Sequence, residues 1–69
     1  MQCKFKVGDI IRWGNDYIFV IGKIIKLGED RFFFDKLSTN AYRYLPNFIF
    51  YTNQNNCKLI LKCPEYLHE

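Results

Sequence analysis

The sequence has few of the residues that mark non-globular, membrane-spanning or secreted chains. In 69 residues it has only four Gly and two Pro, which excludes collagen-like and low-complexity classes. No apolar run approaches the roughly 18 to 20 residues of a membrane-spanning helix. The N-terminus has neither the apolar segment nor the small-residue cleavage site of a signal peptide. We therefore expect a soluble, cytoplasmic protein with no membrane partner.

Residues that carry catalysis are equally scarce. The chain has one histidine, His68, next to its last residue, and one serine, Ser38, in a polar cluster typical of a turn. A nucleophile needs a base within reach, and no spacing here brings such a pair together. The glycine patterns of phosphate-binding and dinucleotide-binding loops are also missing. We predict a protein that is not an enzyme and has no cofactor.

Three cysteines, Cys3, Cys57 and Cys63, cannot all pair within one chain, so reduced thiols are the simpler interpretation. With His68 they form a set of four soft ligands, and a zinc site is a weak alternative if the two termini meet. Structural zinc sites usually contain a tight C-x2-4-C pair, whereas the spacing here is C-x5-C-x4-H. We predict no metal.

What the chain does have is apolar and aromatic surface. Its residues are 49% hydrophobic and 19% aromatic, which suits one compact domain over residues 1–69. A chain of this length buries only about 60% of the surface that its unfolded form exposes. The net charge of +3 permits a nucleic-acid partner without requiring one.

The first half of the chain has the pattern of short strands. Residues 3–7, CKFKV, alternate Cys3, Phe5 and Val7 with lysines, as in a half-buried strand. Gly8-Asp9 then predicts a turn or bulge, and residues 10–13 a second strand segment. Gly14-Asn15-Asp16 is typical of the turn in an antiparallel hairpin.

Residues 17–27 are apolar at both odd and even positions, which indicates a bent strand covered on two sides, with the bend or bulge at Gly22. Gly28-Glu29-Asp30 predicts the next turn, followed by a third strand over residues 31–37. Ser38-Thr39-Asn40 is expected to end that strand, and the alternation in residues 41–45 predicts a fourth.

Pro46 is expected to end the fourth strand, because proline donates no hydrogen bond to a sheet. Residues 48–51 are compatible with a short strand, a helical turn or a packed loop. Residues 57–63 alternate again and predict the last strand, with Cys57, Leu59, Leu61 and Cys63 on one side and Lys58, Ile60 and Lys62 on the other.

FKVGDIIR at residues 5–12 and YIFVIGKI at residues 17–24 resemble the opening of small SH3-like barrels of phage and bacterial proteins. The resemblance covers about residues 5–37 and implies a first strand that begins after a hydrophobic-Gly-Asp turn. The glycine spacing of true KOW motifs is absent. We therefore expect an all-β fold, a small single-domain SH3-like antiparallel barrel of five to six strands, with a helical turn after Pro46 as an option.

Two surface features suggest binding. If residues 3–7 pair with residues 57–63, one outward face carries Lys4, Lys6, Lys58 and Lys62, as a solubility device or an anion-binding face that Arg12, Lys23 and Lys26 would widen. Seven Phe, five Tyr and one Trp exceed what so small an interior encloses. The expected partner-binding aromatics, suited to a half-wet site, are Trp13, Tyr17, Tyr42, Tyr44 and Tyr51.

These features predict a small binding module. The expected partner is a protein, and the resemblance makes a phage or mobile-element protein the preferred source, acting on a host protein or nucleoprotein complex, for example as an inhibitor of bacterial defence. The alternative is direct nucleic-acid binding, with lysines on phosphates and aromatic rings stacked on bases. The oligomeric state is left open.

Overall fold

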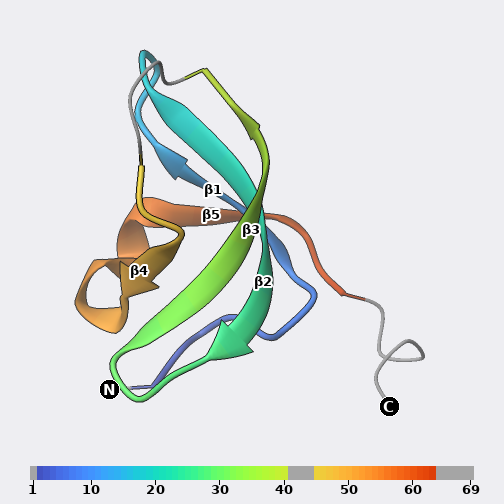
Figure 1. Ribbon diagram of the computed structural model, residues 1–69, viewed down its shortest axis with the longest axis vertical. Coiled ribbons are helices and arrows are strands. Elements are labelled where there is room, and N and C mark those ends of the chain that lie inside the picture. Colours follow the sequence, from blue (N-terminus) through green and yellow to red (C-terminus); the bar gives the residue numbers. More distant parts are fainter. Residues whose placement is uncertain (1, 41–44, 64–69) are drawn as a thin grey trace.

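The computed structural model describes residues 2–40 and 45–63. Within these ranges the chain forms one antiparallel sheet of order β4-β3-β2-β1-β5, curled into a half-barrel (Figure 1). Its strands are β1 (Ile10–Gly14), β2 (Phe19–Leu27), β3 (Arg31–Thr39), β4 (Phe48–Phe50) and β5 (Cys57–Leu61), with a 3-10 helix η1 (Tyr51–Asn56) before β5. The predicted all-β, SH3-like class of fold is confirmed.

The segment before β1 differs from its prediction. Residues 3–7 form no strand, and Val7, expected on the buried side, has 45% of its surface exposed, while Phe5 is buried. Alternation alone predicted a strand here, but residues 3–7 pair with no described strand, and the Asp9 N–H donates to the Lys6 carbonyl at 3.0 Å to form a turn. Gly8 has a φ of 99°, a left-handed conformation that glycine adopts without strain.

The N-terminal segment is held instead by a side-chain amide of η1. The Nε2 of Gln54 donates to the carbonyl of Gln2 at 2.8 Å, and its Oε1 accepts from the backbone N–H of Lys4 at 2.8 Å. The amide thus makes the two hydrogen bonds that a neighbouring peptide group would make in a sheet. Gln54 is itself buried, so both of its polar atoms are satisfied where water is excluded.

Asp9 connects three separate parts of the chain. It is 4% exposed, and its two carboxylate oxygens accept from the backbone N–H groups of Lys6 and Cys63, each at 2.9 Å. Its own carbonyl accepts from the N–H of Ile24 in β2 at 2.9 Å, and the N–H of Gly8 donates to the Ile24 carbonyl at 2.8 Å. The hydrophobic-Gly-Asp turn therefore ties the N-terminal segment to β2 and to the end of the described chain after β5.

The predicted hairpin between β1 and β2 is confirmed. The carboxamide oxygen of Asn15 accepts from the backbone N–H groups of Tyr17 and Ile18, each at 2.8 Å, which fixes the turn locally. Gly14 has a φ of 124°, and a Cβ there would collide with the Ile18 carbonyl. Because the turn extends over residues 15–18, β2 begins at Phe19 and not at Tyr17.

The predicted irregularity at Gly22 is also confirmed. The register of β2 against β3 shifts between Ile21 and Gly22, and again between Ile24 and Lys26. A Cβ on Gly22 would overlap the ring of Phe34 on the facing strand. The glycine lets the two strands approach closely where β2 bends, and this lets one long strand serve both ends of the half-barrel.

β3 is longer than its sequence pattern suggests. Ser38 and Thr39, predicted to end the strand, belong to it and pair with Ile21 and Val20 of β2. Thr39 Oγ1 also donates to the Phe19 carbonyl at 2.7 Å. The strand ends at Thr39, and the next residue is Asn40, whose Nδ2 donates to the carbonyl of Tyr17 at 2.7 Å and whose Oδ1 accepts from the N–H of Phe19 at 2.9 Å. The predicted turn at residues 28–30 is confirmed by the bond from the Gly28 N–H to the Arg31 carbonyl at 2.8 Å.

The predicted fourth strand, residues 41–45, lies mostly outside the described residues; Leu45 is described and is not in a strand. Residues 48–51 were compatible with a short strand, a helical turn or a packed loop. The structure has residues 48–50 in β4, paired with β3, and Tyr51 as the first residue of η1. In residues 2–40 and 45–63 no helix has the length and apolar character needed to cross a membrane.

The core lies on the concave side of the sheet and is centred on Phe32. The ring centroid of Phe32 lies 5.8 Å from that of Phe5, 6.4 Å from that of Phe34 and 6.5 Å from that of Tyr51. The core residues are Phe5, Ile11, Val20, Ile24, Phe32, Phe34, Ile49, Tyr51 and Cys57.

The last strand is less buried than predicted. β5 ends at Leu61, not at Cys63, and Leu59 and Leu61, expected to face inward with Cys57, are 47% and 59% exposed. The reason is the open form of the sheet. β5 is an edge strand, and all of its residues after Cys57 are exposed.

The Asp9 contacts give the first testable prediction. An Asp9→Asn substitution keeps the shape but removes one of the two acceptor oxygens, so one buried backbone N–H loses its partner. We expect the free energy of unfolding to fall by about 1 to 3 kcal/mol. Urea denaturation of both proteins measures the difference. Asp16→Asn, in the exposed β1–β2 turn, is the matched control; an equal effect of the two substitutions would contradict the role of Asp9.

Candidate functional site

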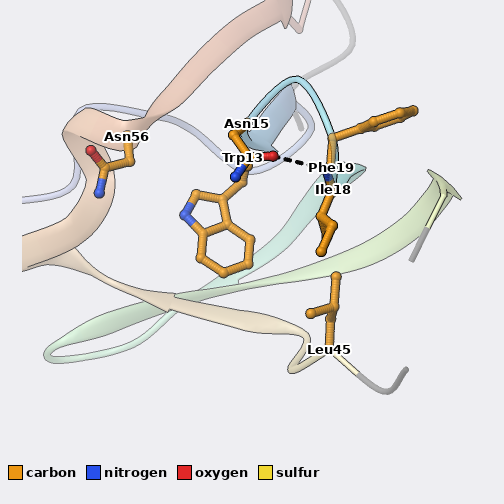
Figure 2. A pocket seen from close by; sticks show the side chains of 7 residues that line it. Trp13, Asn15, Ile18, Phe19, Leu45 and Asn56 are labelled. Carbon is orange, nitrogen blue, oxygen red and sulfur yellow. Dashed lines mark hydrogen bonds between the residues drawn. The ribbon is translucent and has the colours of Figure 1, made fainter. Parts of the chain in front are cut away.

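An open pocket lies at one end of the half-barrel. Its volume is about 440 Å³, and three parts of the chain line it: the end of β1 with the β1–β2 turn, the residue Leu45 before β4, and the last residue of η1. Figure 2 shows the indole of Trp13 in the middle of the pocket, with Asn56 to one side and Ile18 and Leu45 to the other. The lining residues are Trp13, Gly14, Asn15, Ile18, Phe19, Leu45 and Asn56.

Strand geometry puts Trp13 in this position. Side chains alternate along a strand, so Trp13 lies on the same side of β1 as Ile11, which is fully buried. Its register partners are Val20 in β2 and Cys57 in β5, both in the core. Trp13 and Leu45 pack against the core without being enclosed by it. The pocket is therefore the outer end of the core, which no residue in the described part of the chain encloses.

The polar groups of the pocket differ in their availability. The Oδ1 of Asn15 is already used by the backbone of the turn. Within the described residues, no hydrogen bond occupies the Trp13 indole N–H or the Asn56 side chain. Figure 2 shows the indole nitrogen on the side of the ring toward Asn56. These two residues can therefore offer donors and an acceptor to a bound group.

The lining of the pocket is apolar and amide-bearing. None of the lining residues carries a carboxylate, an imidazole, a thiol or an amine, so the lining supplies no general acid, base or nucleophile. Four large apolar side chains and two amides match the composition of pockets that hold an apolar group and orient it with a few polar contacts.

The structure separates the predicted aromatic residues. Trp13 lines the pocket, whereas Tyr17 is 85% exposed in the adjacent turn and does not line it. Tyr51 is buried, and its hydroxyl donates to the Gly28 carbonyl at 2.5 Å, so the expectation that it is exposed is wrong. As the first residue of η1, it faces the core. Two further candidates, Tyr42 and Tyr44, lie outside the described residues.

The pairing behind the predicted lysine face is wrong. β5 pairs with β1 and not with residues 3–7, so Lys4 and Lys6 are not brought opposite Lys58 and Lys62 by a sheet. The Nζ of Lys4 bonds to the Asn55 side chain at 3.3 Å. The residue opposite Lys58 is Arg12, one of those named as widening the face.

The cysteines form no metal site in the described residues, where no group of three or more His, Cys, Asp or Glu side chains could hold an ion. His68 lies outside those residues. Cys3, Cys57 and Cys63 are free thiols. Burial raises the pKa of Cys57 to about 11, although the charge of Lys4 opposes this, and burial also raises the pKa of Cys3. Both shifts favour the unreactive thiol form.

An aromatic and cationic cluster on the convex side was missed in the sequence. The guanidinium carbon of Arg31 lies 4.8 Å from the ring centroid of Phe48 and 4.4 Å from that of Phe50, and its Nε lies 2.8 Å from Asp30 Oδ1. The period-two spacing of Phe48 and Phe50 indicated that the two rings share one face of a strand. The sequence did not show that this strand pairs with β3, which carries Arg31. The Arg31 guanidinium is thus already in contact with both rings and with the Asp30 carboxylate.

Compared with protein-family models, curated proteins and solved structures, the chain matches none. Its function is therefore argued from its own residues.

The raised pKa of Cys57 predicts a loss of stability at alkaline pH. Because the thiol titrates near 9 when unfolded and near 11 when folded, its contribution is complete below pH 9 and disappears as the pH rises through about 11. We expect the free energy of unfolding to fall in this window, and to fall less in a Cys57→Ala variant. Some fall remains, since burial also raises the pKa of Cys3 and Tyr51.

Urea denaturation at a series of pH values, in the presence of a reductant, measures this dependence. Comparing slopes against pH removes the constant cost of the smaller side chain. An identical slope in the variant and the unmodified protein would show that Cys57 is not responsible.

Proposed function

We propose that this protein is a non-enzymatic binding module that recognises a protein partner by taking an apolar side chain of that partner into the Trp13 pocket. The observation that carries the proposal is the pocket itself, about 440 Å³, lined by Trp13, Ile18, Phe19 and Leu45 and by two amides. Its size is at the lower end of the range for ligand pockets, which suits one or two side chains better than a large cofactor.

The surroundings of the pocket support a macromolecular partner. Beside it, Ile18 and Tyr17 are 43% and 85% exposed, so apolar and aromatic surface continues past its rim. Tryptophan and tyrosine are enriched among the residues that contribute most to protein–protein binding. The turn that carries Tyr17 and Ile18 is held by two hydrogen bonds to Asn15 Oδ1, so this rim of the pocket is ordered before a partner binds.

The same proposal includes a mode of action. A module of this size, with no reactive group in its pocket, acts by occupying a site on a larger molecule. We propose a phage or mobile-element protein, acting in the host cytoplasm on a host protein or nucleoprotein complex, for example as an inhibitor of bacterial defence. The support for this source is the resemblance of residues 5–12 and 17–24 to small SH3-like barrels of phage and bacteria.

A second candidate function, direct nucleic-acid binding, is favoured by one observation. Arg12 and Lys58 are opposite each other on β1 and β5, and phosphate groups are natural ligands for two adjacent cations. It predicts binding that weakens steeply as salt rises. The pocket gives it no support, because none of its lining residues is charged.

The proposal predicts that an acidic side chain at the pocket abolishes binding. We expect Ile18→Glu to reduce partner affinity at least about tenfold, because a carboxylate would be buried against Trp13 without a counter-charge. Leu37→Glu is the matched control: Leu37 is 55% exposed on β3 and does not line the pocket, so the affinity should change less than about twofold.

Affinity capture from nuclease-treated extract of the native cells, followed by titration of the purified partner, measures both effects. Trp13 is the chain's single tryptophan, so its fluorescence reports directly on the pocket. Equal loss in both variants, or a captured complex that nuclease releases, would contradict a protein partner at this site.

A further inference from the structure

β5 is an edge strand with unusually apolar exposed side chains. Leu59, Ile60 and Leu61 are 47%, 50% and 59% exposed, although they are consecutive and point to both faces. Among the described strands β5 pairs only with β1 (Figure 1). Its other edge presents backbone N–H and C=O groups that another extended chain can pair with.

The charges beside this edge are of one sign. Lys58 is directly opposite Arg12, a like-charge pair that works against sheet stability. In residues 2–40 and 45–63 the only ion pair is that of Asp30 and Arg31, so no described carboxylate neutralises Lys58 or Arg12. Arg12 is also held in place: its NH2 donates to the Asn15 carbonyl at 3.2 Å, and its guanidinium carbon lies 4.8 Å from the Phe19 ring centroid.

The edge leads directly to the pocket. Asn56 lines the pocket and immediately precedes β5, and Cys57, the first residue of β5, pairs with Trp13. A chain laid along β5 therefore arrives at the Trp13 pocket at one of its ends. A chain along β5 would therefore meet the free backbone groups of the strand, then Lys58, and then the apolar pocket.

We propose that the β5 edge accepts an extended acidic segment of a protein partner as an additional strand, with a carboxylate beside Lys58 and an apolar side chain at its end in the Trp13 pocket. This inference rests on the proposed function, since it specifies the partner of the same pocket. The carboxylate beside Lys58 then offsets the repulsion between Lys58 and Arg12 that the free protein has to bear.

Two other occupants fit less well. A second copy paired antiparallel about Ile60 would place Lys58 opposite Lys62, and one paired about Leu59 would bring no carboxylate to Lys58. A nucleic acid would satisfy the cations but neither the backbone groups of the edge nor three exposed aliphatic side chains. An acidic polypeptide satisfies all of them.

The test uses synthetic fluorescent peptides of about eight residues, long enough to span a strand. One alternates Glu and Val and ends in Phe, the second has Lys in place of each Glu, and the third is the acidic peptide with alternate backbone amides methylated. Binding is measured by anisotropy, and NMR of the labelled protein locates it. We expect the acidic peptide to shift resonances of β5, Arg12 and Trp13, and the other two not to bind.

Lys58→Glu is expected to weaken the acidic peptide at least about tenfold and to remain folded, because it replaces a like-charge pair with an opposite-charge pair. Lys26→Glu is the matched control, an exposed lysine of β2 opposite Phe33 of β3 and separated from β5 by β1, and should change the affinity less than about twofold.

Several results would overturn the inference: absence of binding by the acidic peptide, an equal effect of the two charge reversals, or full binding by the methylated peptide. Oligothymidine that shifts β5 and displaces the acidic peptide would point to nucleic acid, and a dimer in ultracentrifugation whose interface shifts lie on β5 would point to a second copy. If Ile18→Glu loses the native partner while Lys58→Glu does not, the edge inference fails and the proposed function stands.

Discussion

The carboxylate of Asp9, buried and bonded to two backbone N–H groups, is the contact on which the placement of the segment before β1 and of the described residues after β5 depends. One oxygen holds the N-terminal segment through Lys6 and the other holds the chain after β5 through Cys63, while the Asp9 backbone bonds to Ile24 of β2. Without it, the like-charged strands β1 and β5 would have less to keep them together. In a chain too short for a large core, such buried hydrogen bonds replace part of the stabilisation that apolar burial gives to larger domains.

The open curl of the sheet explains both candidate binding features. A sheet that curls without closing leaves the core uncovered at one end, where Trp13 and Leu45 lie, and leaves β5 as an edge. The aliphatic residues of that edge would be buried in a closed barrel, and here they are exposed. The pocket and the free edge of β5 thus both result from the incomplete closure of the sheet. They adjoin at Asn56, which lines the pocket, and Cys57, which begins β5.

Local patterns predicted the parts of this fold that depend on local physics. The turns at Gly14 and Gly28 and the irregularity at Gly22 were predictable, because each needs a glycine or a turn residue at one position. The partners of each strand were not, since the alternation of residues 3–7 does not distinguish a strand from an extended segment held by Gln54. For the site, Trp13 was predictable as a half-exposed ring, while Ile18 and Leu45 became its neighbours only through tertiary packing.

Two side-chain amides, Gln54 and Asn40, stand where peptide groups would continue the hydrogen bonding of the sheet, each donating to one carbonyl and accepting from one N–H. The hydrogen bonding beyond the strands therefore depends at these two places on single side-chain amides, which water can slowly hydrolyse. Conversion of either amide to an acid would set a carboxylate against a carbonyl oxygen, with every core residue still in place. Deamidation at Gln54 or Asn40 would therefore weaken the fold through lost hydrogen bonds and not through lost packing.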